Sequence, residues 1–197
     1  MSEQKSIFRF LEIITNFAYL NILWFFFSLP IFTIFPATTS MLRVFRKWTK
    51  DGENSILENF LHYFKKDCKK GIFIGVIMTF ILASLFGDFF IIMSLKNPWQ
   101  SILLPILIII TLLYIMISLY FLLLFMKLET SMKHLFSIAF VLAVRRPVQP
   151  LALLLIIGIF MVITLYVRFF TILILFSLCG WVHYKVINPL IEKEIKV

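Results

Sequence analysis

The chain has 197 residues, of which 61% are hydrophobic and 15% are charged. Soluble domains are nearer half apolar and about a quarter charged, so this composition excludes an ordinary soluble protein and indicates an integral membrane protein. The net charge of +9 does not indicate nucleic-acid binding, because the basic residues lie between hydrophobic runs, where signals for membrane orientation belong. We expect a single integral membrane domain over residues 1–197.

The first hydrophobic run covers residues 10–29, about the length that a bilayer crossing needs. Glu12, Asn16 and Tyr19 follow one another at helical spacing and share one face of this helix. We expect that face to point at other helices. It is either a polar seam satisfied by packing or part of a substrate or ion pathway, because an intramembrane acid is a functional candidate.

The next stretch, residues 21–40, contains two prolines, and we expect the helix to break at Pro30 and again at Pro36. The freed carbonyls need donors inside a bilayer, and Asn21, Thr33 and Thr38 are the nearest side chains that can help. We therefore predict a broken hinge over residues 29–39, packed against the first span and residues 71–95 rather than against lipid. Residues 29–48 then cross the membrane again or form a re-entrant segment.

A surface helix is predicted next, over residues 55–69. Ser55 and Glu58 have the spacing of a capping box. The apolar positions that we expect to be buried are Ile56, Leu57, Phe60, Leu61 and Phe64, and the basic positions that we expect to be exposed are Lys65, Lys66 and Lys69.

Two long apolar runs follow, residues 71–95 and 100–126, and each is predicted to span the bilayer. Residues 127–146 form another surface segment, because their apolar part is too short to cross. Residues 151–186 are too long for one crossing, so we expect a helical hairpin that turns near residues 166–169, followed by a short charged tail from residue 188. Asp88 and Arg168 should both lie near the outer surface, where they can form a structural ion pair.

The basic residues predict the orientation. With six crossings and both termini cytoplasmic, every Lys and Arg except Lys96 and Arg168 lies inside, which is 17 of the 19. Five crossings would leave a split of 15 to 4 or of 14 to 5. The predicted fold class is therefore an all-α polytopic transmembrane bundle of six membrane helices, or five, with one or two amphipathic helices on the cytoplasmic side.

Motifs of known enzymes do not occur in the sequence: there is no H-E-x-x-H, G-x-S-x-G, Walker loop or dinucleotide fingerprint. The three histidines are isolated from one another and from other metal ligands. We therefore expect a protein that is not an enzyme and that has no catalytic residues, no cofactor and no metal site.

The first third of the chain carries a set of motif residues: Asn21, Trp24, Leu29-Pro30, Thr33, Pro36-Ala37-Thr38, Arg46-Lys47, Phe60, Phe64 and Lys65. With these residues the chain resembles, over nearly its whole length, the YesL-like family of bacterial integral membrane proteins, which was first defined as a domain of unknown function. One position departs from the family pattern: Phe35 stands where members usually carry Gly, which puts a close backbone approach at that point in doubt.

The resemblance implies a bacterial plasma-membrane protein linked to carbohydrate uptake, because members are often found beside genes for that process. We expect a non-enzymatic accessory component whose partners are the lipid bilayer and a sugar-transporter permease or another membrane protein. The alternative is a small transporter with its site at the broken segment. The candidate functional or structural positions are Glu12, Asn16, Asn21, Trp24, Pro30, Thr33, Pro36, Thr38, Asp88 and Arg168.

Overall fold

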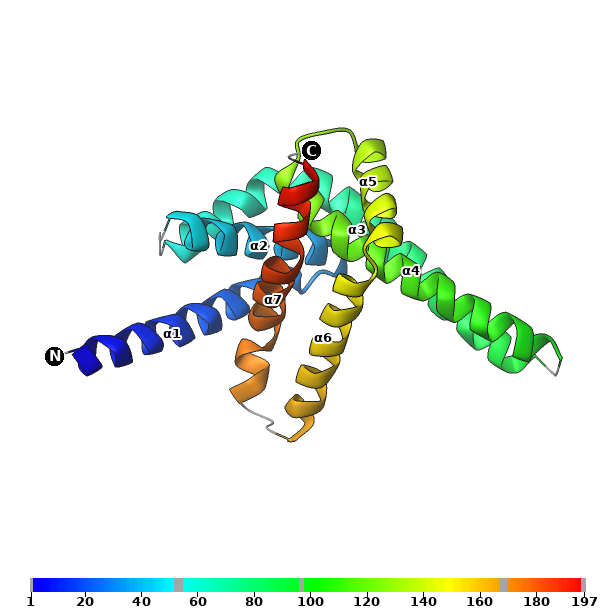
Figure 1. Ribbon diagram of the computed structural model, residues 1–197, viewed down its shortest axis with the longest axis horizontal. Helices are drawn as coiled ribbons and strands as arrows, with labels where there is room; N and C mark the ends of the chain where they lie inside the picture. Colours follow the sequence, from blue (N-terminus) through cyan, green and yellow to red (C-terminus); the bar gives the residue numbers. More distant parts are fainter. Residues whose placement is uncertain (1, 52–54, 96–97, 167–169, 196–197) are drawn as a thin grey trace.

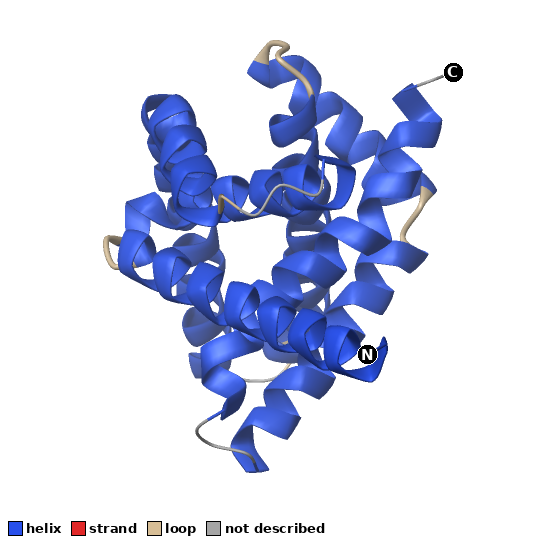
Figure 2. Cartoon of the chain, turned by 90° about the vertical axis from the view of Figure 1, so that its left-hand side faces the viewer, coloured by secondary structure: helices blue, strands red, loops and turns tan. Residues whose placement is uncertain are grey.

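The computed structural model describes residues 2–51, 55–95, 98–166 and 170–195, and within these ranges every regular element is a helix (Figures 1 and 2). The all-α class predicted from the sequence is therefore confirmed. In chain order the elements are α1 (Ser2–Ser28), the short 3-10 helix η1 (Ile31–Thr33), α2 (Ile34–Asp51), α3 (Ile56–Ser94), α4 (Trp99–Lys127), α5 (Met132–Arg145), α6 (Val148–Tyr166) and α7 (Phe170–Ile195).

Helix α2 lies at the centre of the molecule, where it contacts α1, α3, α4 and α7 (Figure 1). Its apolar side chains are buried in one core with those of the surrounding helices, and the most deeply buried of these are Leu42, Phe45, Tyr120, Leu124 and Ile187. An apolar stripe on an amphipathic helix has to be covered by other elements. Here four helices cover it, so α2 organises the packing of the whole bundle.

Three apolar arms leave this centre: α1, the pair α3 and α4, and the pair α6 and α7 (Figure 1). The predicted surface helix and the predicted span after it are one continuous helix, α3, of 39 residues. At 1.5 Å per residue α3 is about 58 Å long, which is longer than a bilayer core. Its first half packs on α2, and its second half carries exposed apolar side chains such as Phe80, Phe86 and Phe90.

Three helices are long and apolar enough to cross a membrane, namely α1, α3 and α4. The pair α5 and α6, bent by 84° between them, gives a fourth if it is counted as one span. The chain is thus a multi-pass membrane helical bundle. Helix α2 is not among these candidate spans in the described part of the chain, because Arg43, Arg46 and Lys47 make it too polar.

The predicted full crossing by residues 29–48 is therefore not supported, and the alternative of a segment that folds back fits better. The predicted hairpin is confirmed in its two legs, since α6 ends at Tyr166 and α7 begins at Phe170, while the turn itself (residues 167–169) lies outside the described residues. The described residues thus contain three candidate spans, or up to four, which is fewer than the six or five membrane helices predicted from the sequence.

The short charged tail predicted from residue 188 is part of α7 in the described residues. Helix α7 continues through Pro189 to Ile195. Lys127 at the end of α4 explains this continuation, because its ammonium group donates to the carbonyl of Asn188 at 3.2 Å and pairs with Glu192 at 3.5 Å. The last turns of α7 are thereby held against α4.

The start of α3 differs from the prediction in two details. Ser55 is the N-cap residue, but its side chain makes no capping hydrogen bond, so the capping box is not formed. Of the five apolar positions expected to be buried, Ile56 and Phe60 are buried, Leu61 and Phe64 are half-buried, and Leu57 is 41% exposed. Lys65, Lys66 and Lys69 are exposed as predicted.

Gly75 of α3 allows this helix to approach the segment between α1 and α2 closely. A Cβ atom on Gly75 would lie 2.9 Å from the carbonyl oxygen of Phe32, whereas a Cβ atom on Gly87, in the same helix, would have nothing within 4 Å. Replacing an exposed helical Gly by Ala stabilises a helix by about 1 kcal/mol. At Gly75 a backbone clash opposes that gain.

We predict that Gly75→Ala lowers the thermal-unfolding midpoint of the protein purified in detergent, and that Gly87→Ala leaves it unchanged or raises it. The two substitutions add the same methyl group to the same helix, so each controls for the other. Equal midpoints for the two variants would show that α3 does not approach the segment between α1 and α2 as described.

Candidate functional site

The chain turns a corner between α1 and α2. Helix α1 ends at Ser28, Leu29 and Pro30 form a bend, and η1 leads directly into α2 at Ile34. Pro36 is the third residue of α2, a position at which the backbone N–H has no partner within a helix and proline is tolerated. The predicted second break at Pro36 is therefore wrong: there is one corner, at Pro30.

Thr33 satisfies the carbonyl groups at this corner, as predicted. Its hydroxyl oxygen lies 2.6 Å from the carbonyl oxygen of Phe27 and 2.7 Å from that of Pro30, so its single proton is shared between them. The backbone N–H of Thr33 also donates to the Pro30 carbonyl, at 2.8 Å. Thr33 and residues 35–37 and 39 are buried, as predicted for the packed hinge. The prediction is wrong for the outer side of the corner, where Leu29, Pro30, Ile31, Phe32 and Ile34 are exposed.

Two further polar side chains tie the corner to the rest of the bundle. The indole N–H of Trp24 donates to the hydroxyl of Thr38 at 3.0 Å, and that hydroxyl donates to the carbonyl of Ile34. The Trp24 ring also stacks on Phe176 of α7, with ring centroids 4.4 Å apart. Asn21, which is buried, accepts a hydrogen bond from the backbone N–H of Ser177 in α7 at 3.2 Å.

The corner also lies directly against α3. A Cβ atom on Gly71 would come within 2.9 Å of the Pro36 ring, which shows how closely the two helices approach. Phe35, the departure from the family pattern, is buried and directs its ring toward α4, with its centroid 5.3 Å from that of Phe125. The close approach between α3 and the start of α2 is thus provided by Gly71 and Gly75 of α3 and does not need a glycine at position 35.

The other predicted positions lie away from the corner contacts. Glu12 is exposed near the outer half of α1, and Asp88 is exposed in the arm formed by α3 and α4. Asn16 is half-buried, and its amide nitrogen is buried without a hydrogen-bond partner in the described part of the chain. Arg168 lies outside the described residues, so its predicted ion pair with Asp88 stays a prediction.

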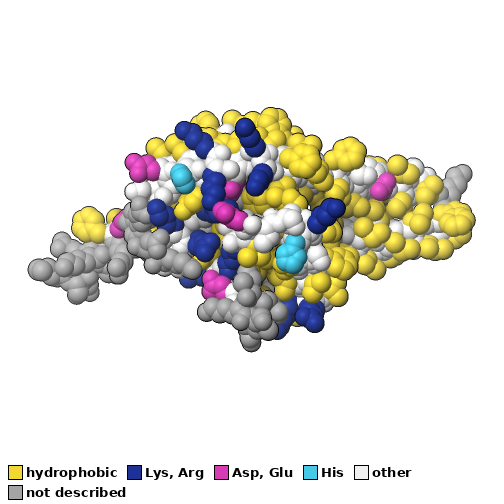
Figure 3. Space-filling view, turned by 90° about the horizontal axis from the view of Figure 1, so that it is seen from above, with side chains coloured by type: hydrophobic (Ala, Val, Ile, Leu, Met, Phe, Trp, Pro, Cys, Tyr) yellow, Lys and Arg dark blue, Asp and Glu magenta, His cyan; other side chains and the backbone are white. Residues whose placement is uncertain are grey.

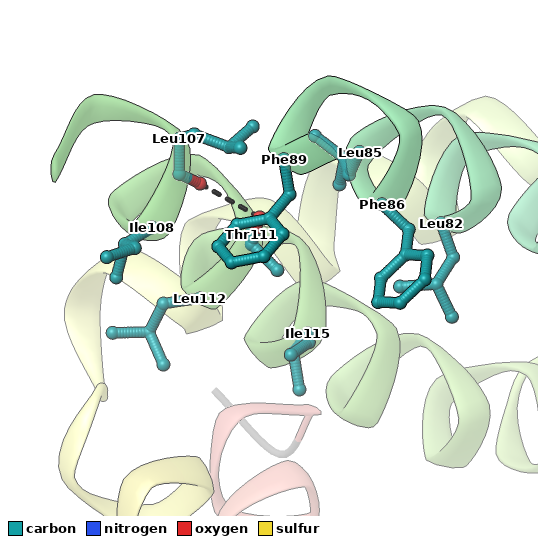
Figure 4. A pocket seen from close by; sticks show the side chains of 9 residues that line it. All are labelled: Leu82, Leu85, Phe86, Phe89, Leu107, Ile108, Thr111, Leu112 and Ile115. Atoms are coloured by element: carbon teal, nitrogen blue, oxygen red, sulfur yellow. Dashed lines mark hydrogen bonds between the residues drawn. The ribbon is translucent and has the colours of Figure 1, made fainter. Parts of the chain in front are cut away.

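Cavities occur elsewhere in the molecule. One of about 380 Å³ lies between α3 and α4 in their arm, and it is lined by apolar side chains and by Thr111, whose hydroxyl bonds to the Leu107 carbonyl at 2.8 Å (Figure 4). Another, of about 790 Å³, is lined by apolar residues of α4 and α6. Neither cavity is lined by a corner residue, and neither offers a free polar group for recognising a polar solute.

A third cavity, of about 460 Å³, is strongly basic. It lies between α2, α3, the end of α4 and the start of α5. Five cationic side chains line it: Arg43, Lys65, Lys66, Lys69 and Lys70. We call it the basic pocket. Figure 3 shows that Lys and Arg side chains gather on the upper face of the molecule, while the arm formed by α3 and α4 is largely hydrophobic.

An ion pair with little exposure to solvent forms one wall of the basic pocket. Arg43 of α2 donates to Asp67 of α3 from Nε at 2.9 Å and from a terminal nitrogen at 3.4 Å. The Arg43 guanidinium also lies 5.7 Å from the centre of the Tyr63 ring. Sequence analysis missed this site because it treated the lysines as a solvated face; the signal was Asp67, an acid within a basic run on a predicted helix.

A second ion pair lies at the rim of the basic pocket, between Lys66 and Glu129, at 2.9 Å. The hydrogen bond and the charge of Lys66 lower the pKa of the Glu129 carboxyl below its ordinary value, and Arg43 and Lys70 lower it further. Glu129 is exposed and therefore stays ionised near neutral pH. Lys66, Arg43 and Lys70, the cations that lower this pKa, all line the basic pocket.

Comparison with known proteins places this architecture in a family. The family described as "Protein of unknown function, DUF624" matches residues 17–89, which contain the corner, α2 and most of α3. The uncharacterized protein YesL of Bacillus subtilis (strain 168) is 30% identical over 142 residues, which are 70% of this chain and 66% of YesL. The chain belongs to the YesL-like family.

A second relative matches a shorter part of the chain. The uncharacterized protein YteU of the same strain is 34% identical over 84 residues, which are 41% of this chain and 38% of YteU. The matched parts therefore leave about a third of YesL, and more than half of YteU, without a counterpart. No solved structure matches the chain.

We predict that Thr33→Val destabilises the protein by about 1–3 kcal/mol, because the Phe27 carbonyl loses its hydroxyl donor in a buried setting. Thr111→Val is the matched control, since the Thr111 hydroxyl bonds only to a carbonyl of its own helix, and it should change stability by less than about 0.5 kcal/mol. Equilibrium unfolding in mixed micelles measures both. A Thr33 variant as stable as the control would mean that the corner does not depend on this hydroxyl.

Proposed function

We propose that the protein is a non-enzymatic accessory component of the bacterial plasma membrane, working with a transporter permease in carbohydrate uptake. The observation that supports this proposal is that the polar side chains of the corner find their hydrogen-bond partners within the corner itself. The hydroxyls of Thr33 and Thr38 and the indole of Trp24 bond to one another or to nearby backbone. These three corner residues thus hold the fold together, and none of them lines one of the cavities described above.

The ionisable groups that the structure describes also support a non-catalytic role. Asp67 and Glu129, the acids at the basic pocket, are each paired with a cation. General acid–base catalysis needs a group free to exchange its proton near the reacting atom. Carboxylates held in ion pairs by Arg43 and Lys66 are poorly suited to that task.

The second candidate function is a small transporter with its site near the broken segment. One observation favours it: the amide nitrogen of Asn16 is buried and has no partner in the described part of the chain. A buried amide without a partner is costly, and a polar solute could satisfy it. The three cavities described above, however, are not lined by Glu12, Asn16, Asn21 or Thr33.

For the orientation, we propose that the face carrying the basic pocket is cytoplasmic, following the positive-inside rule. The C-terminal end lies at the top of Figure 1, whereas the outer ends of the three arms lie lower, α1 to the left, α3 with α4 to the right, and α6 with α7 at the bottom. The sequence predicts both termini inside, which requires α2 to cross. Because α2 folds back along α3 instead, our proposal places the N-terminus outside and the C-terminus inside.

We predict the labelling pattern of single-cysteine variants in a background in which Cys68 and Cys179 are replaced by Ser. Ser131→Cys, in the linker before α5, should react with an impermeant maleimide only after the cells are opened. Trp99→Cys, at the tip of the arm, and an N-terminal tag should be accessible from outside. Labelling of residue 131 in intact cells would contradict the proposed orientation.

We predict that deletion of the protein slows uptake of a carbohydrate whose permease genes lie beside its own gene, and that the chain co-purifies with that permease subunit when the two are co-expressed. A permease from an unrelated gene cluster is the control for non-specific association. The purified chain reconstituted alone in liposomes should not transport the sugar. Transport by the chain alone would contradict the accessory role and support the transporter alternative.

A further inference from the structure

We propose that the basic pocket is a binding site for the phosphate group of an anionic ligand at the membrane surface. The proposal goes beyond the accessory role and does not depend on it. Its starting point is the charge: five cationic side chains and two carboxylates line the pocket, which leaves a net charge of +3. Both carboxylates are already paired, Asp67 with Arg43 and Glu129 with Lys66.

Three lysines of the pocket are available to a ligand. Lys65, Lys69 and Lys70 are exposed and have no hydrogen bond or ion pair with another described residue. Lys65 and Lys69 are one turn apart on α3, and so are Lys66 and Lys70, so their ammonium groups line the same side of the helix. Lysine and arginine are the side chains that proteins use for phosphate.

The wall opposite α3 determines what kind of ligand fits. It comes from the end of α4, the linker after it and the start of α5, and it is apolar at Phe125, Leu128, Met132 and Leu135. A pocket with cations on one wall and apolar side chains on the other suits an amphiphile better than a free ion. Basic pockets between membrane helices on the cytoplasmic side bind anionic lipid headgroups.

The two ion pairs give the pocket a defined shape. Asp67 is buried and fixes Arg43 in position, so the guanidinium does not have to be ordered when a ligand binds. Glu129, by contrast, is at the exposed rim, where it holds Lys66 and partly screens the cations. The phosphate group of a ligand would compete with Glu129 for Lys66, so Glu129 should weaken binding.

The test uses the full chain, purified in detergent micelles, and three probes: dioleoylphosphatidylglycerol, dioleoylphosphatidylcholine and inorganic phosphate. The apparent dissociation constant is measured from the saturable rise in the thermal-unfolding midpoint. We expect saturable binding of phosphatidylglycerol in preference to phosphatidylcholine. Binding of inorganic phosphate at comparable concentration would identify a free phosphate compound as the ligand, and its failure to bind would identify a lipid headgroup.

Variants decide whether binding occurs in the basic pocket. Lys69→Gln with Lys70→Gln should weaken binding by about tenfold, because charge-assisted hydrogen bonds are lost. Lys133→Gln with Arg145→Gln removes the same charge from exposed positions of α5 outside the pocket, and should change binding less than about twofold. Unliganded midpoints and gel filtration establish that each variant is folded.

Glu129→Gln should change the affinity in the opposite direction from the lysine variants. It removes the rim carboxylate and releases Lys66, so it should tighten binding, which a general loss of stability would not do. The proposal is overturned if no anionic probe gives saturable binding, if the two double variants weaken binding equally, or if Glu129→Gln weakens it.

Discussion

The hydroxyl group of Thr33 closes the corner between α1 and α2. In a bilayer every backbone carbonyl needs an internal donor, and a turn at Pro30 leaves the carbonyls of the last turn of α1 without one. Thr33 lies within hydrogen-bonding distance of one of them, the Phe27 carbonyl, and of the carbonyl of Pro30 in the bend itself. Because the turn is closed in this way, α2 can fold back beside α3 instead of continuing across the membrane, and the central position of α2 follows from it.

The corner and the basic pocket are consequences of the same packing. Gly71 and Gly75 let α3 approach the start of α2 closely, and from there the two helices run side by side. That placement brings Arg43 of α2 to Asp67 of α3, where both side chains have little exposure to solvent. Removing one partner of a buried ion pair costs about 3–5 kcal/mol. The pair therefore fixes the register of α2 against α3 and positions the wall of the pocket.

Much of the fold could be predicted from the sequence, because apolar runs of bilayer length and their flanking charges are local signals. The spans, the hairpin legs that meet near residue 166, and the role of Thr33 at the corner belong to this class. The failures involve tertiary contacts. Whether Pro36 breaks a helix depends on where that helix starts, and the continuation of α7 through Asn188 is supported by Lys127, 61 residues earlier in the chain. Periodicity shows that Lys65 and Lys69 share a face, but not that α5 closes a pocket over them.

The positive-inside rule accounts for an excess of cations on one face of a membrane protein, but it does not explain where on that face these cations lie. An orientation signal needs charges on one side of the membrane, and they can be spread over loops and termini. Like charges four residues apart destabilise a helix by about 0.2–0.5 kcal/mol. Helix α3 carries two such pairs, Lys65 with Lys69 and Lys66 with Lys70, and all four side chains line the basic pocket. The carboxylate between them, Asp67, is turned to Arg43 and relieves little of this repulsion. A bound anion would relieve it, which is the physical reason to regard the arrangement as a site.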